Sequence, residues 1–331
     1  MTTHVDRAIG LLDEVRSIAR EVAAVHADDV DRNARFPSET IQALRDAEAL
    51  SAFVPAALGG QGVSLETLAA CCRELGRCCG ASAMVFAMHQ IQVVSLVRHS
   101  APGSSFDRYL SELARSQRLI ASVTSEVGTG GDMGRSIAAL SPAEDGEWKF
   151  EKQAPTVSYA EYADDLLITL RSSPEAEAGD QVLALSRRAD TTLTPTGSWD
   201  VLGMRGTCSP GYVVAAQLSQ DQVLSVRFAE VAAQSMVPVS HILWSHLWLG
   251  IAEDAFERAR SFVKAAAKRS PGELPPVALR LSRVSSELSM LRALVELGLR
   301  DYLDLAEGER REELMTMASV LRFNNLKLAA S

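Results

Sequence analysis

Two changes in the spacing of apolar residues along the 331-residue chain limit the folds that it can adopt. From Val5 to about Ser116, apolar residues recur every three or four positions, as they do on one face of an α-helix. From about Leu119 the chain consists of short Val-, Ile- and Thr-rich runs separated by Gly, Pro, Asp and Ser, which is typical of antiparallel strands. Helical spacing returns near Ala232. This order predicts an α+β multidomain fold with an N-terminal α-helical domain, a central antiparallel β domain and a C-terminal helical bundle, over residues 1–117, 118–231 and 232–331.

The charge and composition of the chain argue against several classes of partner. The net charge is −9 and no cluster of Lys and Arg is present, so binding to nucleic acid or to anionic membranes is not expected. The N-terminus lacks the basic and apolar regions of a secretory signal, and we expect no apolar run long enough to span a bilayer. The sequence therefore predicts a cytoplasmic protein without a membrane partner.

Four of the five cysteines lie in one short segment, "CCRELGRCC". Zinc-binding cysteines are usually paired on a turn with two residues between them, whereas this segment has the spacing of a helix. The sequence therefore predicts no metal site here, and reduced thiols that pack as small apolar residues at Cys71, Cys72, Cys78 and Cys79.

A glycine-rich stretch, "SVTSEVGTGGDMG", follows the first predicted strand, and its glycines at 128, 130 and 134 read G-x-G-x-x-x-G. A dinucleotide-binding loop of similar spacing opens a helix within an alternating βαβ unit. Here the chain after Gly134 contains Pro142 and "EDGE" and predicts another strand instead. The pattern therefore favours a strand and turn that face a different kind of ligand.

Four stretches then resemble a known family in their order and separation. They read "FPSETIQALRDAEALSAFVPAALGGQG", "FAMHQ", "SVTSEVGTGGD" and "VLGMRGTCS". Together they resemble the acyl-CoA dehydrogenase family of flavoproteins, over nearly the whole chain. The resemblance implies the domain order given above, and we interpret His89, in the second stretch, as a structural residue on a buried helix.

The resemblance implies an FAD cofactor whose flavin ring lies against two strands. Family members usually read T-E-P-x-x-G-S-D and W-I-T at these strands. Ser125 keeps a hydroxyl at the threonine position, while Gly131 replaces a serine and Thr156 replaces the aromatic residue that covers the flavin. The residues implied for the cofactor are Ser122, Val123, Thr124, Ser125, Gly130, Gly131, Thr156, Val157 and Ser158. The family also binds the FAD diphosphate and adenosine with an arginine of a neighbouring subunit, and Arg269 lies at about that place, where an exposed basic helix end is the alternative.

The activity implied by the resemblance is α,β-dehydrogenation of an acyl-CoA thioester, with hydride transfer to flavin N5 and a carboxylate as base. No residue of this sequence is assigned as that base, because the segment that carries it in the family is not matched before Ser331 and Ser240 is nearest to its alternative position. His241 and His246 are titratable and close by, but ordinary helix positions are favoured for both. We interpret Glu253 and its neighbour Asp254 as surface charges.

Several alternatives stay open from the sequence. The partners implied are an acyl-CoA substrate, an electron acceptor such as an electron-transfer flavoprotein, and further copies of this chain in a homodimer or homotetramer. The second enzymatic hypothesis is a related two-component flavin-dependent monooxygenase, and the third is a non-catalytic family member that acts as a partner subunit. We also expect the C-terminal bundle to be incomplete, with the chain continuing beyond Ser331.

Overall fold

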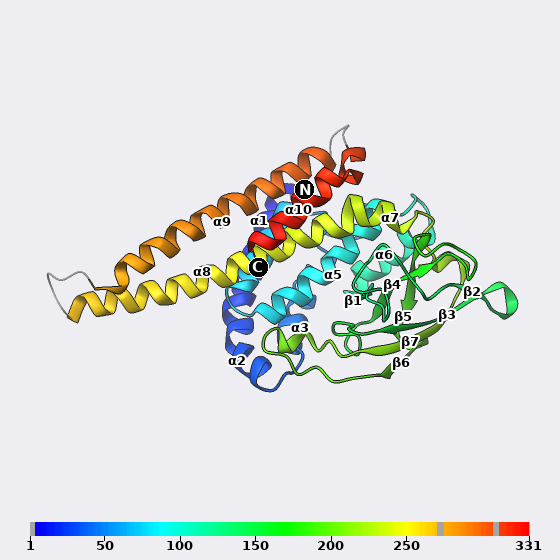
Figure 1. The fold of residues 1–331 in the computed structure, drawn as a ribbon, viewed down its shortest axis with the longest axis horizontal. Coiled ribbons are helices and arrows are strands. Elements are labelled where there is room, and N and C mark those ends of the chain that lie inside the picture. The colour runs from blue at the N-terminus through cyan, green and yellow to red at the C-terminus, as the bar shows by residue number, and fades with distance from the viewer. Residues whose placement is uncertain (1–3, 270–274, 307–310, 331) are drawn as a thin grey trace.

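The computed structural model describes residues 4–269, 275–306 and 311–330, in which helices precede and follow a group of strands (Figure 1). The first helical region carries apolar residues on one face of each surface helix, and those faces form one core. A five-residue π-helix joins the first two helices. The helices are α1 (His4–Ile18), α2 (Ala24–Arg32), α3 (Ser38–Asp46), α4 (Leu65–Gly76), α5 (Gly80–His99) and α6 (Ser105–Ser116).

Helix α5 lies at the centre of this region because it is apolar on every side. Its length and composition are those of a helix that can cross a membrane, contrary to our expectation that no apolar run reaches that length. In the fold, 78% of the relevant 18-residue window is buried among other elements, and the core helix of a soluble protein passes the same test of length and composition.

The strands form two sheets. The first has the order β1 (Ile120–Val123), β4 (Asp165–Arg171) and β5 (Gln181–Arg187), and the second has the order β2 (Ser141–Pro142), β3 (Trp148–Ala154), β7 (Tyr212–Leu218) and β6 (Thr191–Pro195). All pairings are antiparallel except that of β1 with β4, which is parallel. The prediction of an antiparallel domain is therefore wrong for this pair, because the chain crosses to the second sheet after β1 and returns in the same direction.

The second helical region contains α7 (Phe228–Val231), α8 (Val237–Arg269), α9 (Val277–Ala306) and α10 (Met317–Ala330). The first half of α8 packs against α4 and α5, and its second half extends with α9 away from the rest of the molecule (Figure 1). Helices α4 and α8 cross closely at two glycines. A Cβ atom at Gly76 would lie 2.4 Å from the Leu247 carbonyl oxygen, and one at Gly250 would lie 2.2 Å from the Arg73 carbonyl oxygen.

A buried carboxylate joins α4, α8 and α9. Glu253 is 3% exposed and accepts hydrogen bonds from Arg73 Nε (2.8 Å), Arg77 Nη1 (3.1 Å) and Arg292 Nη2 (2.6 Å). Burial alone would raise the pKa of Glu253, but the hydrogen bonds from Arg73 and Arg292 outweigh it and lower that pKa. The interpretation of Glu253 as a surface charge is therefore wrong, because two arginines at the end of α4 and one on α9 make its burial possible.

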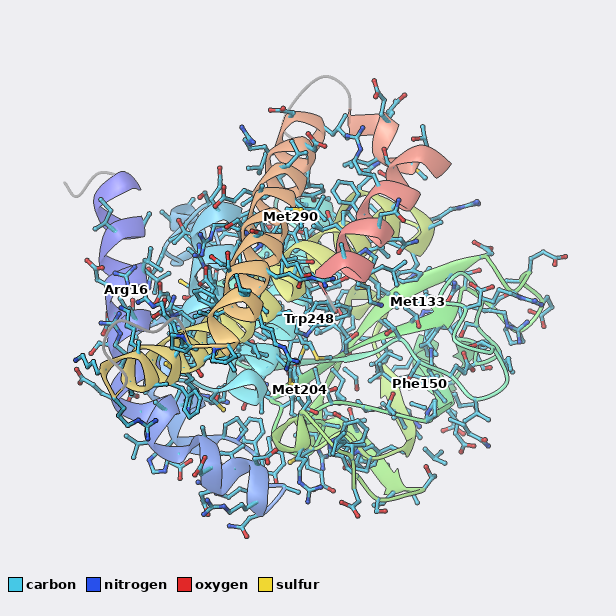
Figure 2. All side chains as sticks on the ribbon, turned by 60° about the vertical axis from the view of Figure 1, so that its left-hand side comes forward. Arg16, Met133, Phe150, Met204, Trp248 and Met290 are labelled. Atoms are coloured by element: carbon cyan, nitrogen blue, oxygen red, sulfur yellow. The ribbon has the colours of Figure 1, made fainter. Side chains whose placement is uncertain are left out.

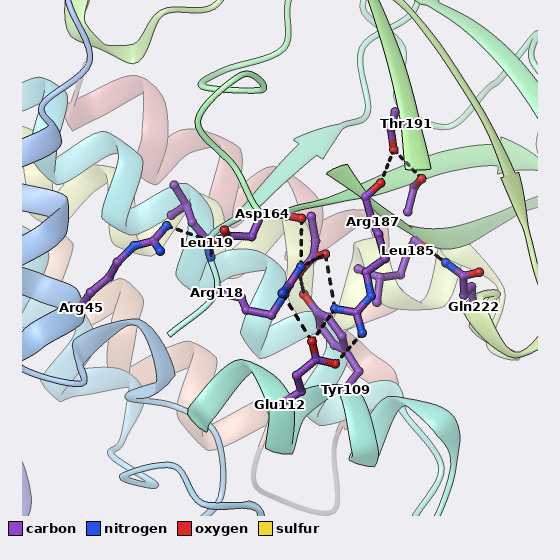
Figure 3. A network of polar contacts seen from close by, with 12 residues as sticks. Arg45, Tyr109, Glu112, Arg118, Leu119, Asp164, Leu185, Arg187, Thr191 and Gln222 are labelled. Atoms are coloured by element: carbon purple, nitrogen blue, oxygen red, sulfur yellow. Dashed lines mark hydrogen bonds and ion pairs between the residues drawn. The ribbon is translucent and has the colours of Figure 1, made fainter. Parts of the chain in front are cut away.

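A network of charges connects the first helical region to the start of β1 (Figure 3). Buried Asp165, on β4, accepts hydrogen bonds from Tyr109 Oη (2.8 Å) and Arg118 Nε (2.6 Å). Its neighbour Asp164 accepts from Arg45 Nη2 (2.9 Å) and from the Leu119 amide (2.7 Å). These contacts fix the residues that follow, at the junction of helices and strands.

Candidate functional site

Three segments of the β domain converge in one corner, and they are the segments that the resemblance singles out. Residues 122 and 123 end β1, and residues 124 and 125 follow it directly. The Ser125 hydroxyl donates a hydrogen bond to the Thr156 carbonyl at 2.7 Å. The amide of Val157 donates in turn to the Pro210 carbonyl at 3.0 Å. The structure therefore brings residues 122–125 and 156–158 together, next to the end of the "VLGMRGTCS" stretch. The expectation that 156–158 form a second strand is wrong, because β3 ends at Ala154 and these residues follow it in a loop.

Strand β1 is an edge strand, so its outward peptide groups are available to other partners. The outward groups of Ile120 are taken: its amide donates to His89 Nδ1 (3.1 Å), and its carbonyl accepts from Tyr159 Oη (3.0 Å). Strand alternation turns the peptide groups of Ser122 to the same side, where no described residue hydrogen-bonds to them. A planar ligand with donors and acceptors on its edge fits these free groups.

Short hydroxyl side chains surround that free edge. Ser125 Oγ and Thr156 Oγ1 lie 3.5 Å apart, with Thr156 exposed and Ser125 partly exposed. Ser158 is also partly exposed, and its Oγ accepts a hydrogen bond from Ser209 Oγ at 2.9 Å. Each hydroxyl can donate or accept, so this set can match the alternating edge of a flavin ring.

The predicted glycines shape the turn after this strand. Gly128, Gly130 and Gly131 have φ values of 93°, 65° and 85°, in the left-handed region that favours glycine. A Cβ atom at Gly130 or Gly131 would meet open space, so the backbone conformation rather than close packing within the chain requires glycine. A side chain at Gly131 would therefore be strained in this conformation although there is space for it.

The sequence analysis did not identify Glu126, which anchors the turn. Its carboxylate is 7% exposed and accepts hydrogen bonds from Ser136 Oγ (2.6 Å) and from the amides of Ile137 (3.0 Å) and Ala138 (2.6 Å). Lys152 Nζ lies 3.5 Å away. Burial alone would raise the pKa of Glu126, but the Ser136 hydrogen bond and the Lys152 charge outweigh it and lower that pKa. The sequence signal was its match to the glutamate of the family pattern T-E-P-x-x-G-S-D, directly after Ser125.

Backbone strain is concentrated beside the same corner. Among the described residues, six other than glycine have positive φ, and four of these lie at this junction. They are Ala34 (47°), Tyr159 (43°), Met204 (56°) and Cys208 (42°). The Tyr159 amide donates to the carbonyls of Thr207 (2.8 Å) and Cys208 (3.1 Å), which holds the two strained segments together. Strain of this kind is commonly retained at functional sites.

His89 has the structural role that was predicted for it. Because the Ile120 amide donates to its Nδ1, that nitrogen is unprotonated, and the Nε2 proton is donated to the Leu50 carbonyl at 2.7 Å. Burial lowers the pKa of His89 to about 4. The neutral ring therefore links α5 to β1.

The two histidines of α8 are also buried. His246 Nδ1 bonds to the Ile242 carbonyl at 2.8 Å within the same helix, and His241 lies beside Trp244 with ring centroids 6.3 Å apart. Burial lowers the pKa of each histidine to about 4. Neither ring hydrogen-bonds to residues 122–125 in the part of the chain that the structure describes, and both occupy ordinary helix positions.

Arg269 is not brought to the corner within one chain. It is the exposed last residue of α8, at the end of the α8–α9 extension farthest from the strands (Figure 1). The prediction that it serves a neighbouring subunit is not tested by a single chain and stays a prediction.

A groove of about 770 Å³ lies beside the same turn, on the exposed side of β3. Its lining includes Val127, Ile137, Lys149, Gln153 and Arg171, and none of the predicted cofactor residues. Arg171 uses its guanidinium to donate to the carbonyls of Ile137, Pro174 and Ala176, so it holds loops together.

Comparison with known proteins gives one family and a shared fold. The family model "Acyl-CoA dehydrogenase, N-terminal domain" matches residues 7–117. The "Probable FMNH2-dependent monooxygenase SfnC" of Pseudomonas putida is 28% identical over 257 residues, which are 74% of this chain and 61% of that protein. This chain spans about two thirds of the length of the curated relatives that it matches first.

Two solved structures have the same fold as this chain. FMN-bound TdsC from Paenibacillus sp. A11-2 superimposes with a TM-score of 0.82 at 22% identity, over 97% of this chain and 83% of TdsC. Butyryl-CoA dehydrogenase from Megasphaera elsdenii superimposes with a TM-score of 0.82 at 15% identity, over 98% of this chain and 84% of that enzyme. Both a monooxygenase and a dehydrogenase therefore share its arrangement of helices and strands.

Proposed function

We propose a function from the premise that this chain belongs to the acyl-CoA dehydrogenase family, whose members are flavin-dependent oxidoreductases or monooxygenases. The function is that of a monooxygenase that binds reduced flavin mononucleotide and uses molecular oxygen. When bound, the reduced flavin supplies the two electrons with which one oxygen atom enters the substrate and the other leaves as water.

One observation carries this proposal: Thr156 and Ser125 form an exposed pair of small hydroxyls where the family pattern has a threonine and a covering aromatic residue. A small, polar side chain at 156 leaves the side of the ring open, which favours access of oxygen and of a second substrate. The free peptide groups of Ser122 and the hydroxyls of Ser125 and Ser158 would hold the ring edge.

The choice of FMN over FAD rests on similarity to the proteins named FMNH2-dependent SfnC and FMN-bound TdsC. FMN lacks the adenylate for which the family uses an arginine of a neighbouring subunit, and Arg269, at the end of α8, stays the predicted residue for that contact if FAD is bound.

Dehydrogenation of an acyl-CoA with FAD is the second candidate, favoured by the family domain over residues 7–117. That reaction needs a carboxylate base whose pKa is raised. Three carboxylates stand out as buried among the described residues, and all are ion-paired: Glu126, Asp165 and Glu253. The pKa values of Glu126 and Glu253 are lowered, which is the opposite of what a base requires.

The test compares both cofactors and both reactions in the purified protein. Fluorescence titration with FMN and FAD, oxidised and reduced, gives the preferred cofactor. A flavin reductase, NADH and oxygen labelled with oxygen-18 are then supplied with indole and dibenzothiophene as first probes, and labelled product is expected. Anaerobic bleaching of bound FAD by butyryl-CoA, without any oxygen-dependent product, would overturn the monooxygenase in favour of the dehydrogenase.

A further inference from the structure

Three hydroxyl groups form a chain behind the proposed flavin site. Thr207 Oγ1 lies 2.9 Å from the Met204 carbonyl oxygen and 2.8 Å from Ser209 Oγ. Ser209 Oγ donates to Ser158 Oγ at 2.9 Å. Thr207 and Ser209 are each 3% exposed, whereas Ser158 is partly exposed. The row of hydroxyls therefore runs from the interior to the surface of the corner.

The direction of the protons in this row of hydroxyls follows from its last contact. Ser209 Oγ donates its single proton to Ser158 Oγ at 2.9 Å rather than to the Thr207 carbonyl at 3.3 Å. The 2.8 Å contact between Thr207 Oγ1 and Ser209 Oγ is then a hydrogen bond in which Thr207 donates and Ser209 accepts. Ser158 then accepts from behind, and no described residue accepts its own proton.

The backbone holds this arrangement in register. The amides on either side of Ser158, those of Val157 and Tyr159, donate to the carbonyls of Pro210 (3.0 Å) and Thr207 (2.8 Å). Tyr159 keeps its positive φ in this position, so Ser158 and Ser209 cannot separate without loss of two backbone hydrogen bonds. The hydroxyls of Thr207, Ser209 and Ser158 are thus held in place before any ligand binds.

We propose that Ser209 is a positioning residue, which directs the hydroxyl proton of Ser158 toward an acceptor on the ring edge of the bound flavin. The inference rests on the proposed function, because it needs a flavin in this corner. Ser209 is buried and acts through Ser158 rather than by contact with the ring. Thr207 orients Ser209 from behind.

The experiment is a double-mutant cycle on flavin binding. Ser209→Ala and Ser158→Ala are each expected to raise the Kd for oxidised FMN about five- to tenfold, as expected for one lost hydrogen bond. Both variants should shift the visible absorption of bound FMN in the same direction. The double variant should bind no more weakly than Ser158→Ala alone, because Ser209 has no effect once Ser158 is gone.

Two further variants separate positioning from stability. Ser209→Thr keeps a hydroxyl, so its Kd for FMN and the absorption spectrum of its bound FMN should match those of the unchanged protein. This variant can be measured even if Ser209→Ala is too unstable to assay. Ser198→Ala, at an exposed serine of the same connection, is the matched control and should bind as the unchanged protein does. Additive losses in the double variant, or normal binding by Ser209→Ala, would overturn the inference while leaving the proposed function intact. A protein that binds neither FMN nor FAD would overturn both.

Discussion

At the scale of single residues, the structure places charged and titratable groups where their burial depends on a specific partner. His89 is buried with both ring nitrogens engaged, and Glu126 is buried with three hydrogen bonds and a nearby lysine. Such groups make the folding free energy sensitive to pH and to substitutions that remove one partner.

The pH dependence of stability should include a contribution from His89. Its pKa is about 4 in the folded chain and 6.5 ordinarily, so the unfolded chain takes up the proton first as the pH falls. The contribution of His89 to the unfolding free energy is therefore fully present above pH 6.5 and is lost as the pH falls from there toward 4. Between pH 7 and pH 5, we expect His89→Gln to remove about 2 kcal/mol of the decrease in unfolding free energy. Urea unfolding at the two pH values measures this, and an unchanged decrease would contradict it.

Replacement of Glu126 by Gln should destabilise the protein by about 2–3 kcal/mol near pH 7, because Lys152 is left buried without its counter-charge. The pKa of Lys152 is already lowered to about 8, chiefly by burial. Without Glu126 the lysine must fold in its neutral form, so the loss should be smaller at pH 9 than at pH 7. Glu151→Gln, at the exposed neighbouring position on β3, is the control. An equal loss at both pH values would argue against this explanation.

At the scale of elements, the packing of α8 on α4 depends on the absence of side chains at the crossing. Gly76 and Gly250 each lie against a backbone carbonyl of the facing helix, at distances that leave no room for a methyl group. The Glu253 cluster lies one turn further along α8 and joins the same two helices to α9. The crossing therefore sets the position of the whole second helical region.

We expect Gly250→Ala to lower the unfolding free energy by about 3 kcal/mol. The added methyl group would overlap the Arg73 carbonyl, and the backbone of α4 cannot move away without loss of its packing on α8. Gly10→Ala is the matched control: Gly10 lies within α1 with nothing near its Cβ position, and alanine there should stabilise by about 0.5–1 kcal/mol. Thermal or urea unfolding compares the two. Equal effects at both glycines would show that the close crossing is not the cause.

The elements also show which features the sequence can predict. Local spacing predicted the order of helices and strands, because burial of one helix face or alternate strand positions leaves a local pattern. The parallel pairing of β1 with β4 and the burial of Glu253 could not be predicted, since each depends on residues far along the chain. The corner proposed for the cofactor was predicted through the resemblance of separated motifs, and the buried hydroxyls behind Ser158 have no local signal in the sequence.

At the scale of the whole molecule, the α8–α9 extension leaves apolar side chains uncovered. Met290, Leu294 and Leu297 are 65%, 38% and 46% exposed, and their spacing places them on one side of α9. Met290 is labelled on α9 in Figure 2, clear of the strands. Side chains of this kind, gathered on one side of a helix, are typical of a surface that another protein covers.

We expect these residues to join two copies of this chain, as the sequence-based prediction of a homodimer or homotetramer proposes. The double variant Met290→Glu/Leu294→Glu should shift the assembly toward monomer in sedimentation velocity, because two charges would be placed in an apolar contact. Leu202→Glu is the control, since Leu202 is fully exposed on a separate connection between strands. A monomeric unchanged protein at all concentrations would contradict the prediction.

The hydrogen bond between the Ile120 amide and His89 has a consequence for how the parts of the molecule can be followed in solution. This amide belongs to a strand, yet its acceptor belongs to a helix of the first region, so it is shielded from solvent deuterium only while the two regions stay docked. Its exchange rate therefore reports the opening of that junction separately from the unravelling of either region. Comparison of this one amide with and without flavin would measure how far cofactor binding tightens the junction beside its own site.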